Sequence, residues 1–133
     1  MTTINRYIGQ VTLLVKDYDK AIKWYTDKLD FKLIEDKPLP EQGGKRWVII
    51  APDRNSKFQL LLAKASTKHQ SHFVGNQSGG RVFLFLYTTN FFKDFSDLSS
   101  KGIKFIREPE THNYGKVAVF QDLYGNLWDL IEP

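Results

Sequence analysis

The sequence predicts an α+β fold in which two βαβββ modules follow one another within a single domain spanning residues 1–133. Three observations predict this fold. Hydrophobic patterns follow the order β-α-β-β-β over about residues 5–63, and the same order returns over about residues 80–133. The segments LDFKLIE (residues 29–35) and KGIKFIR (residues 101–107) are also alike, and both are typical of a helix that leads into a strand. Two copies of one unit predict two open sheets that curl around a shared cleft.

The first module begins with a β-rich run over residues 7–15, which Asp17 follows. A helix is expected next, because apolar residues recur at the spacing of one helix face and Asp17 is placed to cap the first amides. These apolar residues are Tyr18, Ala21, Ile22, Tyr25 and Leu29. Strands are then predicted over residues 31–35, 47–50 and 58–62, with a loop over residues 38–44 and a turn over residues 54–56.

The second module repeats this order. A strand is predicted over residues 82–87, a helix over residues 91–100, and strands over residues 103–106, 116–120 and 127–131. Between the modules, residues 64–80 are rich in Ser, Thr, His, Gln, Asn and Gly and show little periodicity. This composition predicts a linker that can act as a mobile flap.

The composition is that of a globular protein, with 41% hydrophobic residues, 26% charged residues and no cysteine. No apolar run approaches the roughly 20 residues that a membrane helix needs, so no membrane contact is expected. The N-terminus has no signal-peptide pattern, and a cytoplasmic location is expected. The net charge of +4 comes from lysines and arginines spread along the chain. Because no basic stripe with stacking aromatics is present, nucleic acid is not an expected partner.

Two segments at opposite ends of the chain carry a family resemblance. Residues 11–31 (VTLLVKDYDKAIKWYTDKLDF) join a strand that ends at an Asp to a helix with a Trp-Tyr pair, and residues 120–127 (FQDLYGNL) contain a Gly-Asn turn. Together they resemble the opening and closing signatures of the vicinal oxygen chelate superfamily, which includes glyoxalases, bleomycin-resistance proteins and extradiol dioxygenases. Asp30 replaces the usual Gly of the first signature, and Leu123 replaces the usual Pro of the second. The resemblance covers nearly the whole chain and implies the predicted fold.

The resemblance also implies four ligand positions for a divalent metal, with one His, Gln or Glu from each of four strands. These positions fall on Gln10, Gln59, Phe83 and Asp129. Phenylalanine cannot ligate a metal, which leaves two neutral amides and one carboxylate without an imidazole. We therefore expect no metal and no other cofactor. A divalent metal held by the two glutamines and Asp129 is the alternative.

Further residues are candidates for contact with a substrate or ligand. The three polar residues at the ligand positions are expected to line a wet cavity. Four aromatic residues on predicted strands are either core residues or a platform for a ligand. These candidates are Trp47, Phe83, Phe85 and Trp128.

Two residues of the second half complete the candidate set. Arg107, placed near the start of a loop, is either a solvent-facing charge or a contact for an anionic substrate. Tyr114 is a further candidate binding residue, seven residues later in the sequence. The histidines are expected at the surface, with His69 and His72 in the linker and His112 in a loop.

Two function classes follow. The first is a binding module whose aromatic-lined, metal-free cleft takes up a small, partly apolar molecule, as the resemblance to bleomycin-resistance proteins implies. The alternative is a lyase, isomerase or dioxygenase that uses the metal above, or Asp129 as a metal-free general base. No Cys-His pair, Ser-His-Asp set or nucleotide-binding glycine motif occurs in the sequence. The resemblance implies a homodimer, and a domain that serves only for protein interaction is a third alternative.

Overall fold

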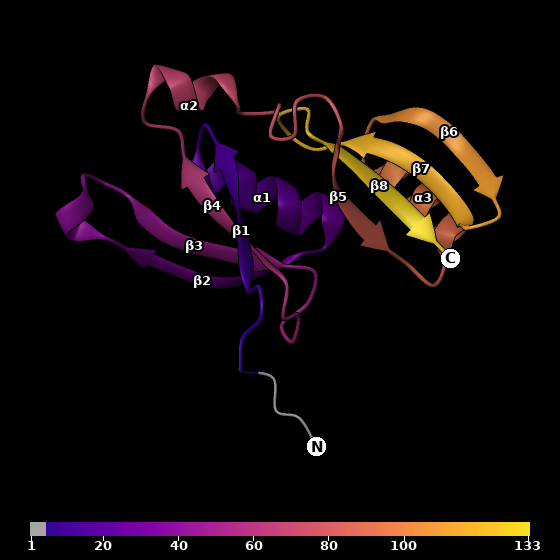
Figure 1. Ribbon diagram of the computed structural model, residues 1–133, viewed down its shortest axis with the longest axis horizontal. Coiled ribbons are helices and arrows are strands. Elements are labelled where there is room, and N and C mark those ends of the chain that lie inside the picture. The colour runs from indigo at the N-terminus through magenta and orange to yellow at the C-terminus, as the bar shows by residue number, and fades with distance from the viewer. Residues whose placement is uncertain (1–4) are drawn as a thin grey trace. The chain divides into compact units, whose positions relative to one another are not determined.

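The computed structural model describes residues 5–133 and divides into two compact units, Met1–Lys64 and Ala65–Pro133, which we call unit 1 and unit 2. Residues 1–4 of the predicted domain lie outside the described residues. Each unit holds one four-stranded mixed sheet and one long helix (Figure 1). This arrangement confirms the predicted α+β fold of two βαβββ modules in tandem.

Unit 1 contains helix α1 and a sheet of four strands. Its elements are β1 (Gln10–Val15), α1 (Tyr18–Leu29), β2 (Lys32–Pro38), the short 3-10 helix η1 (Pro40–Gln42), β3 (Arg46–Ala51) and β4 (Gln59–Lys64). In the sheet order β1-β4-β3-β2, β1 and β4 are parallel and the other pairs are antiparallel. Strand β1 therefore forms one edge of the sheet and lies beside the last strand of the unit.

Unit 2 repeats this topology after an additional short helix. Its elements are α2 (Lys68–His72), β5 (Val82–Tyr87), α3 (Phe91–Ser100), β6 (Phe105–His112), β7 (Gly115–Gln121) and β8 (Leu127–Glu132). The sheet order is β5-β8-β7-β6, again with a parallel pair at one edge. Within residues 5–133, no helix is both long and apolar enough to cross a membrane.

Helix α1 begins and ends at aspartates. The carboxylate of Asp17 accepts a hydrogen bond from the Lys20 backbone N–H at 2.8 Å, which is the predicted N-cap. This hydrogen bond lowers the pKa of Asp17. At the other end, Asp30 adopts a left-handed conformation with φ 56°. Aspartate tolerates this conformation better than most residues, which explains how it can stand where the family signature has glycine.

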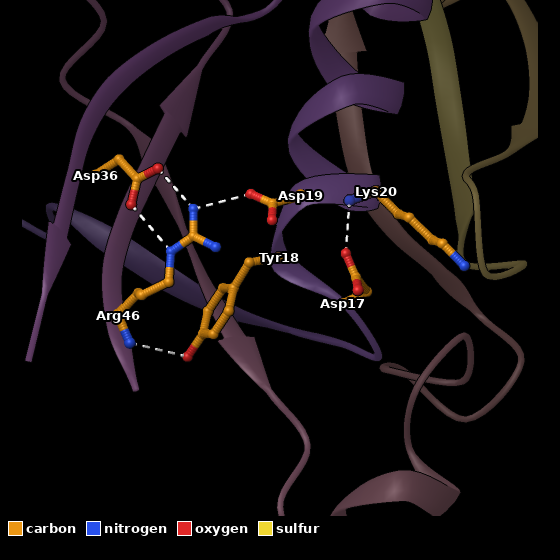
Figure 2. A network of polar contacts seen from close by, with 6 residues as sticks. All are labelled: Asp17, Tyr18, Asp19, Lys20, Asp36 and Arg46. Atoms are coloured by element: carbon orange, nitrogen blue, oxygen red, sulfur yellow. Dashed lines mark hydrogen bonds and ion pairs between the residues drawn. The ribbon is translucent and has the colours of Figure 1, made fainter. Parts of the chain in front are cut away.

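A polar network joins α1 to strands β2 and β3 (Figure 2). The Arg46 guanidinium donates to both carboxylate oxygens of Asp36 at 3.1 and 2.7 Å and to Asp19 at 3.0 Å. It also lies 5.0 Å from the centre of the Tyr18 ring, and the Arg46 backbone N–H donates to the Tyr18 hydroxyl. Because the side chain of Arg46 is only 26% exposed, these contacts are screened less than those of a surface ion pair.

The helix-covered face of each sheet forms its hydrophobic core. In unit 1, the buried strand residues of this face include Leu13, Val15, Val48, Ile50, Leu60 and Leu62. In unit 2, an aromatic chain runs from Phe91 through Phe95, Phe105 and Phe120 to Trp128. Side chains alternate along a strand, so the residues between these positions point to the opposite face.

The segment over residues 64–80, predicted as a linker between the modules, contains helix α2 and an anchored loop that its composition did not predict. Thr67 caps α2 by accepting from the backbone N–H of Gln70, three residues later. Beyond α2, the backbone N–H of Gln77 donates to the side-chain oxygen of Asn126 in the β7–β8 turn. Gly75 also lies so close to Tyr124 that a Cβ added to Gly75 would lie 1.9 Å from the carbonyl oxygen of Tyr124.

The Gly-Asn turn of the second signature is held by two buried polar residues. One carboxylate oxygen of Asp122 accepts from the backbone N–H groups of residues 124–126, at 2.9 to 3.0 Å. The other accepts from the side-chain amide of Asn126 at 2.9 Å. Asp122 and Asn126 are only 6% and 2% exposed, so these hydrogen bonds offset the cost of their burial. The motif therefore serves the fold.

Candidate functional site

The face of the unit 2 sheet that α3 does not cover carries a half-buried carboxylate. Along β8, Trp128 and Leu130 are buried in the core on the α3 side. Asp129 lies between them in sequence, so its side chain points to the uncovered face. Strand alternation thus places one acidic group among apolar neighbours on this face.

A row of paired residues crosses this face from one sheet edge to the other. Phe85 on β5 lies opposite Asp129, and Asp129 lies opposite Val119 on β7. Val119 in turn pairs with Arg107 on β6. Arg107 was predicted near the start of a loop, and this is wrong because β6 runs on to His112. Two bulges around Arg107 interrupt the alternation from which a strand would be recognised.

Exposed aromatic rings border Asp129. Phe85 is 57% exposed, and Tyr87, two residues further along β5, is 63% exposed and lies opposite Ile131. Large exposed rings on neighbouring positions of one sheet face offer an apolar surface for a ligand. Tyr87 was not a predicted candidate. It shares the alternation of Phe83 and Phe85, which is the signal that could have identified it.

The electrostatics of Asp129 differ from those of a surface aspartate. Burial raises the pKa of its carboxyl group, and the positive charge of Arg107 opposes this shift without cancelling it. Within residues 5–133, no backbone or side-chain group donates a hydrogen bond to this carboxylate. A half-buried acceptor without a protein donor is free to accept from a bound molecule or from water.

Two candidate residues of unit 1 lie side by side. Gln10 and Gln59 are paired in the parallel register of β1 and β4, and the Gln10 Nε2 donates to the Gln59 Oε1 at 3.4 Å. Both lie at the N-terminal ends of their strands. Trp47 is half-buried, and it points to the face of this sheet away from α1, because the side chains of its neighbours Arg46 and Val48 lie on the α1 side.

These residues do not fit a divalent metal. In unit 1, the two glutamines offer only neutral amide oxygens and hydrogen-bond to each other. In unit 2, Phe83 has no ligand atom, and it lies at a register shift of β5 while Phe85 is the residue opposite Asp129. The described part of the chain holds no cluster of three or more His, Cys, Asp or Glu residues that suits a metal ion.

The remaining candidates lie away from the row on unit 2. Trp128 is only 3% exposed and stacks on Phe120 in the core, so it offers no surface to a ligand. Tyr114 is exposed at the β6–β7 turn and stacks on His112. His112 ends β6, so its predicted position in a loop is wrong for the same reason as that of Arg107.

The other two histidines belong to the short helix α2 within the predicted linker. His69 and His72 lie on α2, and the ring of His69 makes an edge contact with Phe73 at 5.2 Å. Neither has an acidic partner among the ion pairs of residues 5–133. Both are therefore separate from the candidate site on the strands of unit 2.

Comparison with known proteins gives consistent matches over nearly the whole chain. A family model described as Glyoxalase/Bleomycin resistance protein/Dioxygenase superfamily matches residues 7–130. An uncharacterized protein of Shewanella frigidimarina (strain NCIMB 400) is 53% identical over 125 residues, which cover 94% of this chain and 92% of that protein. The crystal structure of UcmS2 is 27% identical with a TM-score of 0.81, over 96% of this chain and 98% of that chain. The crystal structure of TnmS3, an antibiotic binding protein from Streptomyces sp. CB03234, is 24% identical with a TM-score of 0.76, over 99% of each chain.

Proposed function

The chain belongs to the glyoxalase/bleomycin resistance protein/dioxygenase superfamily, and on this basis we propose that it binds a small, partly apolar molecule. The proposed site is the uncovered face of the unit 2 sheet, where Phe85 and Tyr87 supply aromatic surface. Asp129 supplies a hydrogen-bond acceptor, and Arg107 supplies a positive charge. We propose that binding needs no metal, because the residues at the superfamily's ligand positions do not fit one.

The Asp129 carboxylate carries this proposal. It is partly withdrawn from water, it accepts no hydrogen bond from the described residues, and an exposed aromatic ring lies opposite it. A ligand that places an aromatic ring on Phe85 and a hydroxyl or amine on Asp129 would satisfy both groups at once. Polar groups that fix the orientation of a molecule on an apolar surface are typical of small-molecule sites.

The fold shared with TnmS3 supports the same function. That protein is an antibiotic binding protein, so a chain with this architecture can bind a small molecule. At 24% identity the likeness shows the fold alone, and the identity of the ligand does not transfer. Binding by this chain is therefore inferred from its own Phe85, Asp129 and Arg107.

Metal-free acid-base catalysis is a second candidate, and one observation favours it. Burial raises the pKa of Asp129. A carboxyl group with a shifted pKa beside an apolar surface is typical of general acids and bases. Binding and catalysis would use the same face. Turnover of a bound compound that is lost in Asp129→Asn even at a saturating concentration of the compound would favour the enzyme, and binding without turnover would favour the binding protein.

The binding test is a thermal-shift screen of aromatic phenols, aromatic amines and bleomycin, followed by calorimetry of any compound that stabilises the protein. Phe85→Ala and Asp129→Asn should each weaken binding about tenfold, since the first removes the aromatic contact and the second removes the negative charge of the hydrogen-bond acceptor, at about 1–3 kcal/mol each. Phe92→Ala is a matched control, because Phe92 is also 57% exposed but lies on α3. Equal binding by all three variants would place the ligand elsewhere.

We also propose the homodimer and the cytoplasmic location expected from the sequence. Closed two-fold dimers are the commonest assemblies of small soluble proteins, which supports a dimer without identifying its interface. Light scattering at micromolar concentration should give twice the chain mass of 15.5 kDa. A mass of one chain would refute the dimer and leave the proposed binding function intact.

A further inference from the structure

We propose that a pocket in unit 1, at the N-terminal ends of β1 and β4, binds a small oxyanion such as a carboxylate or phosphate group. This site lies in a different unit from the proposed ligand-binding face and does not depend on it. The pocket has a volume of about 400 Å³ and is lined by Tyr7, Gly9, Gln10, Ser56, Lys57 and Gln59. Its lining contains one cation and no carboxylate.

Lys57 is the charged group of this pocket. Some lysines of unit 1 make ion pairs, as Lys23 does with Asp27 and Lys32 with Asp30, whereas others, such as Lys45, make none with the described residues. Lys57 makes none with any residue in the range 5–133. An ammonium group without a carboxylate partner at the wall of a pocket attracts anions, and an oxyanion can accept a charge-assisted hydrogen bond from it.

The glutamine pair supplies a second donor. The Gln10 amide donates to the Gln59 Oε1, so the Gln59 Nε2 keeps both of its hydrogens for another acceptor. If the two amides were reversed, the other glutamine would offer its NH₂ group instead, and one donor group would remain in either arrangement. The pair therefore presents an amide donor to the same pocket that Lys57 lines.

Two further residues shape the pocket. The Ser56 hydroxyl donates to the Phe58 carbonyl at 2.7 Å, which fixes the turn that leads from Lys57 into β4. The Tyr7 ring lies against Gly9, where an added Cβ would meet its Cε2 atom at 3.5 Å. Tyr7 is 76% exposed, so its hydroxyl is accessible to a ligand as a third donor.

The positive charge of this pocket is the opposite of the charge that a metal site needs. Gln10 and Gln59 occupy two positions at which the superfamily resemblance implies ligands of a divalent cation, yet the pocket they line also contains Lys57. The lysine repels a cation and attracts an anion. In this chain the two amides are therefore suited to hydrogen-bond an oxyanion beside a fixed positive charge.

The test is a two-dimensional ¹H–¹⁵N NMR titration of the full chain with sodium phosphate and, separately, with sodium acetate. Sodium chloride at matched ionic strength serves as the reference, because it reports screening alone. We expect saturable shifts of the Gln10 and Gln59 side-chain amides, with millimolar affinity for at least one oxyanion. The two titrations distinguish a phosphate site from a carboxylate site.

Lys57→Gln should weaken this binding about tenfold, while Lys45→Gln should leave it unchanged. Lys45 is also exposed in unit 1 but does not line the pocket. The dispersion of the backbone signals shows whether each variant is folded. Shifts that match those with chloride, or that weaken equally in both variants, would overturn the proposal. Neither result would affect the binding function proposed for unit 2.

Discussion

Phe85 lies directly opposite Asp129 in the parallel register of β5 and β8, on the sheet face that α3 leaves uncovered. The pairing places an exposed aromatic ring beside a carboxyl group whose pKa is raised by burial. A ligand that covers the ring would remove more water from the carboxyl group. Such a ligand must supply a hydrogen-bond donor, or Asp129 must take up a proton as the ligand binds.

Replacement of Asp129 by asparagine should change how stability depends on pH. The folded pKa of Asp129 is raised, so the folded state binds this proton more tightly than the unfolded chain. Asp129 therefore makes its full contribution to the unfolding free energy at pH values below its unfolded pKa. This contribution is lost as the pH rises through its folded pKa. Asparagine cannot ionise. From about pH 3 to about pH 7, the unfolding free energy of Asp129→Asn should therefore rise relative to wild type, by under about 1 kcal/mol because solvent screens the site.

Urea unfolding at a series of pH values measures this difference. Asp27→Asn is a control at an exposed carboxylate, and it should be slightly less stable than wild type at neutral pH because it removes the pair with Lys23 at 2.9 Å. A difference between wild type and Asp129→Asn that stays constant with pH would show that burial does not perturb this carboxyl group.

Arg46→Met should destabilise the protein by about 1–3 kcal/mol, because it leaves the half-buried Asp36 carboxylate without its bidentate partner and removes the cation from the Tyr18 ring. Urea unfolding measures the loss. Lys23→Met removes an exposed i,i+4 pair and should cost only about 0.3–0.5 kcal/mol. Equal losses in the two variants would mean that the network in Figure 2 contributes no more than a surface ion pair.

Gly75→Ala should destabilise the protein far more than Gly79→Ala. Both glycines have positive φ, of 78° and 68°, so both substitutions carry backbone strain of about 1–2 kcal/mol. Only at Gly75 would the new Cβ meet a neighbour, the Tyr124 carbonyl oxygen at 1.9 Å. We expect an additional loss of about 2 kcal/mol for Gly75→Ala, as for an overpacked site.

Thermal unfolding of the two glycine variants, with limited proteolysis of the segment over residues 73–80, checks this expectation. Faster cleavage in Gly75→Ala alone would accompany loss of the contact with the β7–β8 turn. Similar melting temperatures for both variants would show that the loop moves away from Tyr124 at little cost, and that its anchoring is weak.

The fold was predictable because each βαβββ module shows both helical and strand periodicity. The helix over residues 91–100 and the strand over residues 82–87 have the predicted boundaries. Helix α2 was missed although Thr67 and Gln70 have the spacing of a capping box, because its five residues show no apolar stripe. Short helices without a buried face leave only their capping residues as a signal.

The candidate site was less predictable because it depends on strand register. Counting seven residues back from Asn90 leads to Phe83, but the register shift between Val82 and Leu84 makes Phe85 the partner of Asp129. A bulge arises from pairing with a neighbouring strand, so the sequence of one strand does not reveal it. Lys57 had no signal of its own, since only the pairing of β1 with β4 brings it to a common pocket with Gln10.

Protein purified without added metal should contain no stoichiometric zinc, nickel, manganese or iron, and none of these ions should raise its melting temperature. The reason is chemical: Gln10 and Gln59 offer neutral amides, Phe83 offers no ligand atom, and Asp129 offers the one carboxylate of the set. Any ion that binds the folded state alone must raise the melting temperature, so a thermal-shift series read beside elemental analysis is a direct test. Asp129→Ala should alter ligand binding and leave the metal content unchanged. Stoichiometric metal that disappears in this variant would contradict the prediction and make a metal-dependent lyase, isomerase or dioxygenase the better description of the protein.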